Sequence, residues 1–281
     1  MTLTYLSSIL MGILQGVAEF LPISSSGHLA LFQYFFGMED FESTQMFFTV
    51  MLHFGTLISV FIYYWRDIVD MIREFFLLIG SLVSGGRERG AVPPARRMIL
   101  LIIVATLPLF VILPVKRFIE AATGSVTFVS IALLATGCML FFSDQLARGR
   151  KSAKNATVLD ALLVGCAQAV GTLPGISRSG STISAGMMRG FDRTFAVRFS
   201  FLMSLPAVFG ATLLELKDAL ELGLDPAILP FCAVGVVVSA VVGWFAIRLV
   251  NLLADKGKFG KFAYYCWAVG LVSLIAGFFV K

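Results

Sequence analysis

The chain has 281 residues, of which 58% are hydrophobic and only 14% are charged. A soluble domain of ordinary composition carries about 25% charged residues. With a mean hydropathy of +0.90, the chain is excluded from the soluble class and is expected to form one integral membrane domain over residues 1–281. The net charge of +5 is explained by the membrane topology described below, so it predicts no nucleic-acid partner.

The first apolar stretch, about residues 4–36, is interrupted near its centre by Pro, Gly and Ser residues. It is too short to cross a hydrocarbon core of about 30 Å twice and too long to cross it once. We therefore expect a re-entrant hairpin, in which two half-helices meet at a turn and return to the same side. A second interrupted stretch, about 157–188, predicts a second hairpin.

Uninterrupted apolar runs of a length that suits membrane-spanning helices follow each hairpin. The segment 67–80 keeps three acidic residues near one helical face. It either lies in the membrane interface or prolongs the span before it. The expected fold class is therefore all-α, with six transmembrane helices and two re-entrant hairpins. The six spans are about 45–65, 98–114, 126–143, 196–215, 227–247 and 262–280.

Lys and Arg residues are distributed unevenly between the two sides that this topology defines. One set of loops carries 17 of them and the opposite set carries 4. Cytoplasmic loops are enriched in Lys and Arg, so we expect the first set to be cytoplasmic and the N-terminus and first hairpin to open to the outside. The first set is 66–97, 145–156, 189–198 and 248–261; the second is 1–44, 115–125, 216–226 and Lys281.

Two patterns of small side chains concern packing. A stripe of small residues in the span 227–247 permits close helix contact, either within the chain or in a homodimer. The stripe consists of Gly235, Ser239 and Gly243. Four isolated cysteines lack the spacing of metal ligands, so we expect them to be small buried side chains. These are Cys138, Cys166, Cys232 and Cys266.

The two interrupted stretches also repeat one another. With an offset of 153 residues, QGVAEFLPISSSGH (15–28) aligns without a gap on QAVGTLPGISRSGS (168–181), with six identities in 14 positions. Three predicted spans separate the copies, so they form repeats of opposite topology, about 1–144 and 155–281. Inverted repeats with broken helices usually build a binding site where they meet near the middle of the membrane.

The two copies differ in their chemical groups. The first has Glu19 and Ser25 where the second has Thr172 and Arg178. One copy therefore keeps the anionic and nucleophilic groups, and the other supplies a cation. This division of groups is what a single site made from both halves would need.

Breaking the helices exposes backbone donors for an anion. Gln15 and Glu19 are four residues apart and share a helix face, which Pro22 ends because it has no N–H and clashes with the preceding turn. Serines then cap the next half-helix, whose first-turn N–H groups form an anion site. The second copy repeats this device with Arg178, whose planar fork suits phosphate oxygens. We expect substrate to be bound by Gln15, Ser24, Ser26, Gly27, Ser177, Ser179 and Thr182.

Ser25 is a candidate nucleophile, although a serine needs an activating base. His28, one helical turn further on, is its candidate proton partner, with a capping or buried hydrogen-bonding role as the alternative. Glu19 is either the base or a ligand of a divalent cation that bridges phosphate oxygens. His53 has no motif around it, so we expect it to be structural.

The motifs EFLPISSSGH and PGISRSGST, together with FSFLMSLPAVFGA at 199–211, resemble the bacterial undecaprenyl-diphosphate phosphatases, also called the bacitracin-resistance family. The resemblance extends over the whole chain. It implies a multi-pass protein of the bacterial cell membrane that dephosphorylates a polyprenyl diphosphate. That reaction recycles the lipid carrier of cell-wall synthesis and confers bacitracin resistance.

The resemblance also implies roles for single residues. Glu19 becomes a catalytic or metal-binding residue, Ser25 the nucleophile, His28 its proton partner and Arg178 a phosphate clamp. A divalent cation, Mg²⁺ or Ca²⁺, is expected as cofactor. Many members of the family have a glutamate at the position of Gln15, so this chain lacks the second carboxylate that a metal site with two carboxylates would use here. The alternative function is a transporter or flippase of an anionic lipid head group, since inverted repeats are typical of transporters.

Overall fold

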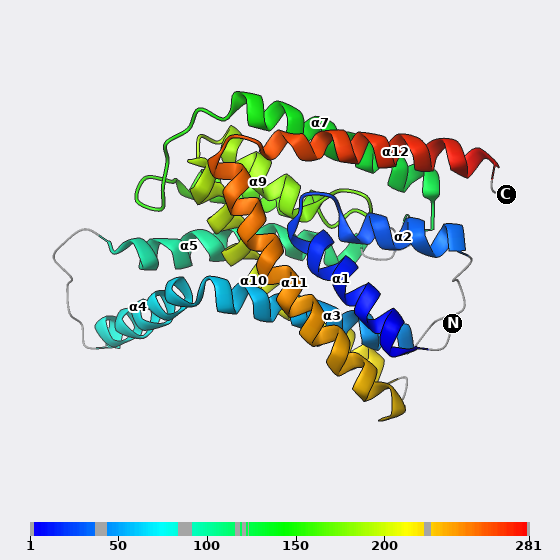
Figure 1. The fold of residues 1–281 in the computed structure, drawn as a ribbon. Coiled ribbons are helices and arrows are strands. Elements are labelled where there is room, and N and C mark those ends of the chain that lie inside the picture. The colour runs from blue at the N-terminus through cyan, green and yellow to red at the C-terminus, as the bar shows by residue number, and fades with distance from the viewer. Residues whose placement is uncertain are drawn as a thin grey trace.

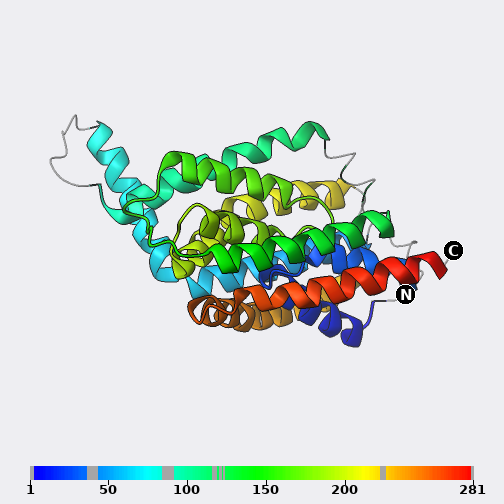
Figure 2. The same ribbon diagram turned by 90° about the horizontal axis from the view of Figure 1, so that it is seen from above.

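The computed structural model describes residues 3–36, 44–83, 92–115, 119, 122, 124–221 and 226–279. Within these residues the regular elements are helices (Figures 1 and 2), apart from a single bridge between Lys151 and Phe191. The α-helices are α1 (Tyr5–Phe20), α2 (Ser25–Phe36), α3 (Thr44–Tyr63), α4 (Trp65–Val83), α5 (Pro94–Thr106), α7 (Val126–Leu146), α8 (Val158–Val170), α9 (Arg178–Met188), α10 (Arg193–Glu221), α11 (Leu229–Asp255) and α12 (Phe262–Phe279). Four short 3-10 helices also occur in this part of the chain: Leu107–Val111, Leu113–Val115, Pro226–Ile228 and Phe259–Lys261.

The expected all-α membrane fold is confirmed. Among the described residues, five helical segments are long and apolar enough to cross a bilayer, and the bent pair of α3 and α4 would make a sixth if it were counted as one span. The five are Pro94–Val111, Val126–Leu146, Arg193–Leu214, Pro226–Asp255 and Phe259–Phe279. Both chain ends lie at one end of the bundle, opposite the connections from α7 to α8 and from α11 to α12 (Figure 1).

The bend between α3 and α4 favours one of the two interpretations of segment 67–80. The two helices meet at 81°, so α4 does not prolong the span before it. Figure 2 shows α4 projecting from the bundle at the end opposite the termini. Its exposed side chains include Val69, Ile72 and Phe76, whereas Asp67 forms an ion pair with Arg198 of α10. An amphipathic helix of this kind suits the membrane interface.

Each hairpin begins with a capped helix and breaks at the expected place. Thr4 caps α1 and Thr157 caps α8, both with reciprocal capping-box hydrogen bonds. α1 ends at Phe20 because Leu21 adopts the extended conformation (φ −63°, ψ 139°) that a following proline favours. α2 then starts at Ser25, so four residues separate the half-helices.

Small residues allow the first helix of each hairpin to touch another helix closely. A Cβ atom on Gly16 would lie 2.8 Å from the carbonyl oxygen of Ser239 on α11. A Cβ atom on Gly165 of α8 would overlap the carbonyl oxygen of Ala105 on α5. The small-residue stripe of α11 is therefore used within the chain, against α1 and α3, and gives no support to a homodimer.

Two of the four cysteines contradict the expectation of burial. Cys232 and Cys266 are buried, but Cys138 and Cys166 are exposed. The physical reason is that the outer surface of a membrane protein is itself apolar between the interfaces. A small apolar thiol on such a surface gains little from burial.

Ion pairs hold the end of the bundle opposite the termini. The Asp160 carboxylate, which is fully buried, accepts hydrogen bonds from Lys151 Nζ (2.7 Å) and Arg189 Nε (2.9 Å). Arg193 pairs with Asp144, and the same carboxylate accepts the N–H of Gly260 at 2.8 Å. These contacts connect the second hairpin to the segments on either side of it.

The close helix crossings predict a position-dependent cost of added methyl groups. Gly16→Ala and Gly165→Ala should each lower the free energy of unfolding by about 1–3 kcal/mol because the new methyl groups meet backbone atoms. Gly80→Ala on α4 is the matched control, since nothing lies within 4 Å of its Cβ position. It should be neutral or stabilise by up to about 1 kcal/mol through helix propensity. Thermal unfolding in detergent measures all three, and equal melting temperatures would contradict the crossings.

Candidate active site

The break in each hairpin is closed by the same serine cap. Ser24 Oγ accepts the N–H of Gly27 at 3.2 Å, and Ser177 Oγ accepts the N–H of Gly180 at 3.1 Å. The two pairs are 153 residues apart, the offset of the sequence repeat. Each cap leaves other N–H groups of the first helical turn available for an anion.

The two breaks pack directly against each other, and the packing is reciprocal. A Cβ atom on Gly27 would lie 2.8 Å from Cα of Gly175, and one on Gly180 would lie 3.2 Å from Cβ of Pro22. Gly27 therefore leaves no room for a methyl group against the backbone of the opposite turn, and a methyl group on Gly180 would be tightly packed between Ser177 and Pro22. The Ser24 hydroxyl also donates to the carbonyl oxygen of Ile176 at 3.3 Å.

Glu19 is the centre of the polar groups between the turns. Its side chain is 8% exposed, and its two carboxylate oxygens have different partners. Oε1 pairs with the Arg178 guanidinium of the other repeat. Oε2 accepts from Ser25 Oγ at 3.1 Å and from Gln15 Nε2 at 3.2 Å. The structure therefore brings together four residues that the sequence had singled out.

His28 is placed differently from the sequence prediction. Its Nδ1 lies 2.8 Å from the carbonyl oxygen of Ser24, and its Nε2 lies 2.9 Å from the hydroxyl of Tyr265 on α12. Both ring nitrogens are thus occupied, and the group hydrogen-bonded to Ser25 is the Glu19 carboxylate. As the proton partner of Ser25, His28 is replaced in this geometry by Glu19, because the imidazole is held against the turn and α12.

His53 belongs to the site, although a structural role was expected from its sequence context. Its Nδ1 lies 3.1 Å from Gln15 Nε2 and 3.7 Å from Glu19 Oε2. No motif surrounds His53, because its neighbours on α3 are core and lipid-facing side chains. The available signal was its chemistry alone, since an ionisable residue within a membrane segment is a functional candidate by default.

Buried polar atoms without partners mark where a ligand would fit. Arg178 Nη1 is buried and has no hydrogen-bond partner among the described residues. The same holds for both amide atoms of Gln168 and for Ser181 Oγ within that part of the chain. Gln168 and Ser181 are the repeat counterparts of Gln15 and His28. That correspondence was the sequence signal for Gln168, which was not selected as a site residue.

The remaining predicted binding residues fall into two groups. Ser26 is exposed near the cap of α2, and its hydroxyl lies 3.4 Å from that of Ser24. Ser179 lies 3.3 Å from Ser177 in the corresponding arrangement. Thr182 instead uses its hydroxyl inside the protein, donating to the carbonyl oxygen of Arg178 at 2.9 Å. Thr182 therefore supports the start of α9 from within.

These side chains alone do not fit a resident divalent cation. No three His, Cys, Asp or Glu side chains come together within the described ranges. Glu19 is the one carboxylate of the cluster, and both of its oxygens already accept hydrogen bonds. Mg²⁺ bound through one carboxylate needs substrate oxygens and water to complete its octahedron.

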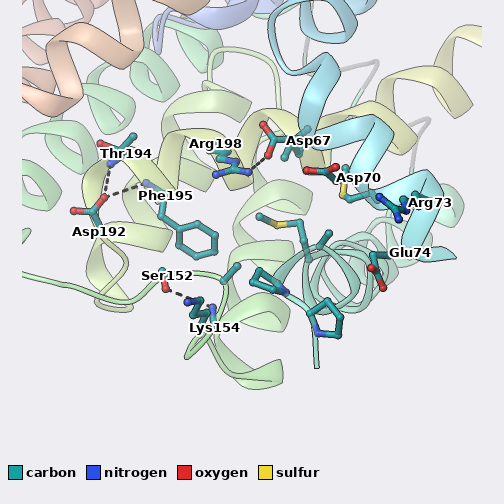
Figure 3. A pocket seen from close by; sticks show the side chains of 17 residues that line it. Asp67, Asp70, Arg73, Glu74, Ser152, Lys154, Asp192, Thr194, Phe195 and Arg198 are labelled. Carbon is teal, nitrogen blue, oxygen red and sulfur yellow. Dashed lines mark hydrogen bonds and ion pairs between the residues drawn. The ribbon is translucent and has the colours of Figure 1, made fainter. Parts of the chain in front are cut away.

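Two hollows of the molecule lie in different places, and only the smaller one is lined by residues of the site. A narrow crevice of about 10 Å³ between α1, α2 and α3 is lined by Gln15 and Ser25 together with apolar side chains such as Leu14 and Leu29. A cavity of about 570 Å³ lies elsewhere, between α4 and the starts of α5 and α10 (Figure 3). Its charged lining includes neither Glu19 nor Arg178, so cavity size does not locate the cluster of reactive groups.

The cluster can perform nucleophilic chemistry on an anion. A serine hydroxyl hydrogen-bonded to a carboxylate has its base in place. A guanidinium with a free nitrogen and two capped helix starts supply positive charge on the opposite side. This arrangement is suited to transfer of a phosphoryl group.

Comparisons with known proteins agree with this chemistry. The family model described as "Bacitracin resistance protein BacA" matches residues 8–272. Similar proteins named undecaprenyl-diphosphatase occur in Alkaliphilus metalliredigens (42% identical, covering 97% of this chain and 98% of the relative) and Halothermothrix orenii (43%, covering 96% and 98%). One from Methanosphaera stadtmanae is 39% identical and covers 97% and 98%. The chain belongs to the BacA family of bacitracin resistance proteins.

Proposed function

We propose that the chain is a membrane phosphatase that hydrolyses undecaprenyl diphosphate to the monophosphate and inorganic phosphate. The observation that carries the proposal is the cluster of Ser25, Glu19 and Arg178 between two broken helices. The names of the relatives supply the substrate. The reaction returns the lipid carrier for cell-wall synthesis and so accounts for bacitracin resistance.

The geometry supports a mechanism in two displacement steps. Ser25 Oγ attacks the terminal phosphorus while Glu19 Oε2, 3.1 Å away, accepts its proton. A bond from Oγ to phosphorus forms, the bond to the bridging oxygen breaks, and the lipid monophosphate leaves. Water then attacks the phosphorus of the phosphoserine and the bond from Oγ to phosphorus breaks. Glu19 returns its proton to Oγ, and both protons of the water leave on the inorganic phosphate. Arg178 Nη1 and the first-turn N–H groups of α2 and α9 stabilise the charge on the equatorial oxygens.

The transporter interpretation shares the inverted hairpins but leaves the Ser25 to Glu19 hydrogen bond without a purpose. A carrier needs to bind an anion and release it, and it needs no serine paired with a base. Purified protein should therefore release inorganic phosphate from a polyprenyl diphosphate in detergent, where no vectorial movement occurs. Movement of the lipid across a vesicle membrane without phosphate release would favour the transporter.

We propose that a divalent cation would be held only when the diphosphate of the substrate is bound. Glu19 is the side chain placed to approach it. The support is the single carboxylate of the cluster. When bound, the cation would neutralise phosphate charge.

Ser25→Ala should lower turnover on the order of 10³-fold or more, because the nucleophile is lost. Ser26→Ala is the matched control, since Ser26 is exposed and lies beside the cap. It should cost far less, as should Ser24→Ala, which removes a cap worth about 1 kcal/mol. Phosphate release measures the three variants. Substantial turnover by Ser25→Ala would show that water attacks directly with Glu19 as base.

Arg178→Lys should lower turnover by about 10²–10³-fold. Lysine keeps the charge, but its ammonium group lacks the planar pair of nitrogens with which a guanidinium binds Glu19 and a phosphate oxygen at the same time. Arg178→Ala leaves the buried Glu19 carboxylate unpaired and should also unfold more easily. The double variant Arg178→Ala with Glu19→Gln removes both charges and should recover the melting temperature but no activity. Recovery of activity in the double variant would reduce Arg178 to a structural ion-pair partner.

The proposed orientation places the N-terminus and the opening of the first hairpin outside the cell. Its support is the excess of Lys and Arg in the loops at the opposite end of the bundle. In a background without native cysteines, Lys217→Cys should react with an impermeant thiol reagent added to intact cells. Lys154→Cys should react only after the cells are permeabilised. The reverse pattern would invert the orientation.

The proposed mode of cation binding predicts that Mn²⁺, used as a probe, binds weakly to the protein alone. Adding methylenediphosphonate, a diphosphate that resists hydrolysis, should create bound Mn²⁺ detectable by electron paramagnetic resonance. Glu19→Gln should weaken that ternary complex. Stoichiometric tight binding of Mn²⁺ without the diphosphonate would instead establish a resident metal site.

A further inference from the structure

The two carboxylate oxygens of Glu19 contact different residues. A guanidinium usually binds both oxygens of a carboxylate, so this pairing is unusual. Arginine commonly binds a carboxylate through two parallel N–H···O bonds, one to each oxygen. Here Arg178 pairs with Oε1, while its Nη1 has no partner among the described residues. Oε2 faces Ser25 at 3.1 Å. Some interaction must prevent Oε2 from turning towards the free nitrogen of the guanidinium.

Gln15 supplies part of that interaction. An ionised carboxylate only accepts hydrogen bonds, so the Gln15 atom that faces Oε2 at 3.2 Å is its NH₂ group. The same nitrogen lies 3.1 Å from His53 Nδ1. An amide NH₂ group has two hydrogens, and both are used here. Gln15 is therefore fixed between Glu19 on its own helix and His53 on α3.

His53 determines which way the Gln15 amide faces. Because Nδ1 accepts from Gln15, the hydrogen of the neutral imidazole is on Nε2. With an apolar residue in place of His53, one N–H of Gln15 would lose its acceptor. The amide could then rotate and turn its carbonyl oxygen towards the Glu19 carboxylate, which would repel it. Only the Ser25 hydroxyl would then hold Oε2 away from the Arg178 guanidinium.

We infer that His53 is a positioning residue for the phosphatase reaction. Acting through Gln15, it holds Glu19 Oε2 beside Ser25 and prevents a two-pronged pair between Glu19 and Arg178. This keeps the base available to the nucleophile and leaves Arg178 Nη1 available to a phosphate oxygen. The inference rests on the function proposed above, because it assigns His53 a task in the same site.

Two amide substitutions of His53 separate this role from simple packing. In His53→Asn, the side-chain carbonyl oxygen can take the position of Nδ1 and accept from Gln15. In His53→Gln, the acceptor lies one bond further out, near the position of Nε2, so Gln15 loses its partner. His53→Asn should keep most of the parental kcat. His53→Gln should lose about 10–100-fold in kcat, the usual effect of removing a partner that orients a reactive group, with KM little changed.

A double-substitution cycle tests the route through Gln15. If His53 acts only by holding Gln15, then Gln15→Leu with His53→Gln should be no slower than Gln15→Leu alone. Phe54→Leu is the control for disturbance of α3, since Phe54 is the exposed neighbour of His53. It should have the parental kcat and melting temperature.

The outcomes are distinguishable from failure of the proposed function. Phosphate release by the parent protein must be present, and its absence would overturn the function before any variant is compared. With the parent active, equal kcat values for His53→Asn and His53→Gln would overturn the positioning role, whether both were high or both low. Fully additive losses in the double variant would also overturn it, because His53 would then act without Gln15.

Discussion

The ion pair between Glu19 and Arg178 is the interaction on which the rest of the structure depends. It joins the first helix of one hairpin to the start of the second helix of the other, so the two repeats meet through it. Either charge alone would cost several kcal/mol in the protein interior. Together they are tolerated, and each keeps an atom for other contacts: Oε2 faces Ser25, and Nη1 has no partner within the described residues. The pair therefore stabilises the meeting of the hairpins and prepares the chemistry there.

The broken helices provide donors that a continuous membrane helix cannot provide. An unbroken helix uses its N–H groups internally, whereas each break exposes a first turn. Ser24, which caps α2, has φ of 70°, a conformation that is uncommon for a residue other than glycine. Its carbonyl oxygen accepts hydrogen bonds from both the backbone N–H (3.1 Å) and the ring Nδ1 (2.8 Å) of His28. His28 thus holds the unusual turn that presents Ser25, and Tyr265 holds His28 in turn. Such strain is typical of functional sites.

The surroundings of the site suit a lipid substrate with a charged head group. The crevice beside Ser25 is lined mainly by apolar side chains of α1, α2 and α3. On the outward side of α1, Leu6 and Leu10 are exposed to the surface that lipid covers. A polyprenyl tail can therefore remain in hydrocarbon while the diphosphate reaches the turns. The crevice itself holds only about one water molecule in volume.

The sequence by itself determined the fold class, the two breaks and four of the central residues, because each leaves a local signal. Composition identifies the membrane, proline and serine mark the breaks, and an offset of 153 residues relates Ser25 to Arg178. Only the tertiary structure decided which side chains are hydrogen-bonded to each other. His28 is near Ser25 along the chain, yet its ring turns to Ser24 and Tyr265, while His53 reaches Gln15 from another helix. Spacing along one helix fixes which residues share a face, whereas a hydrogen bond between helices depends on how those helices cross. That crossing is set by glycines such as Gly16 and by packing that no local pattern encodes.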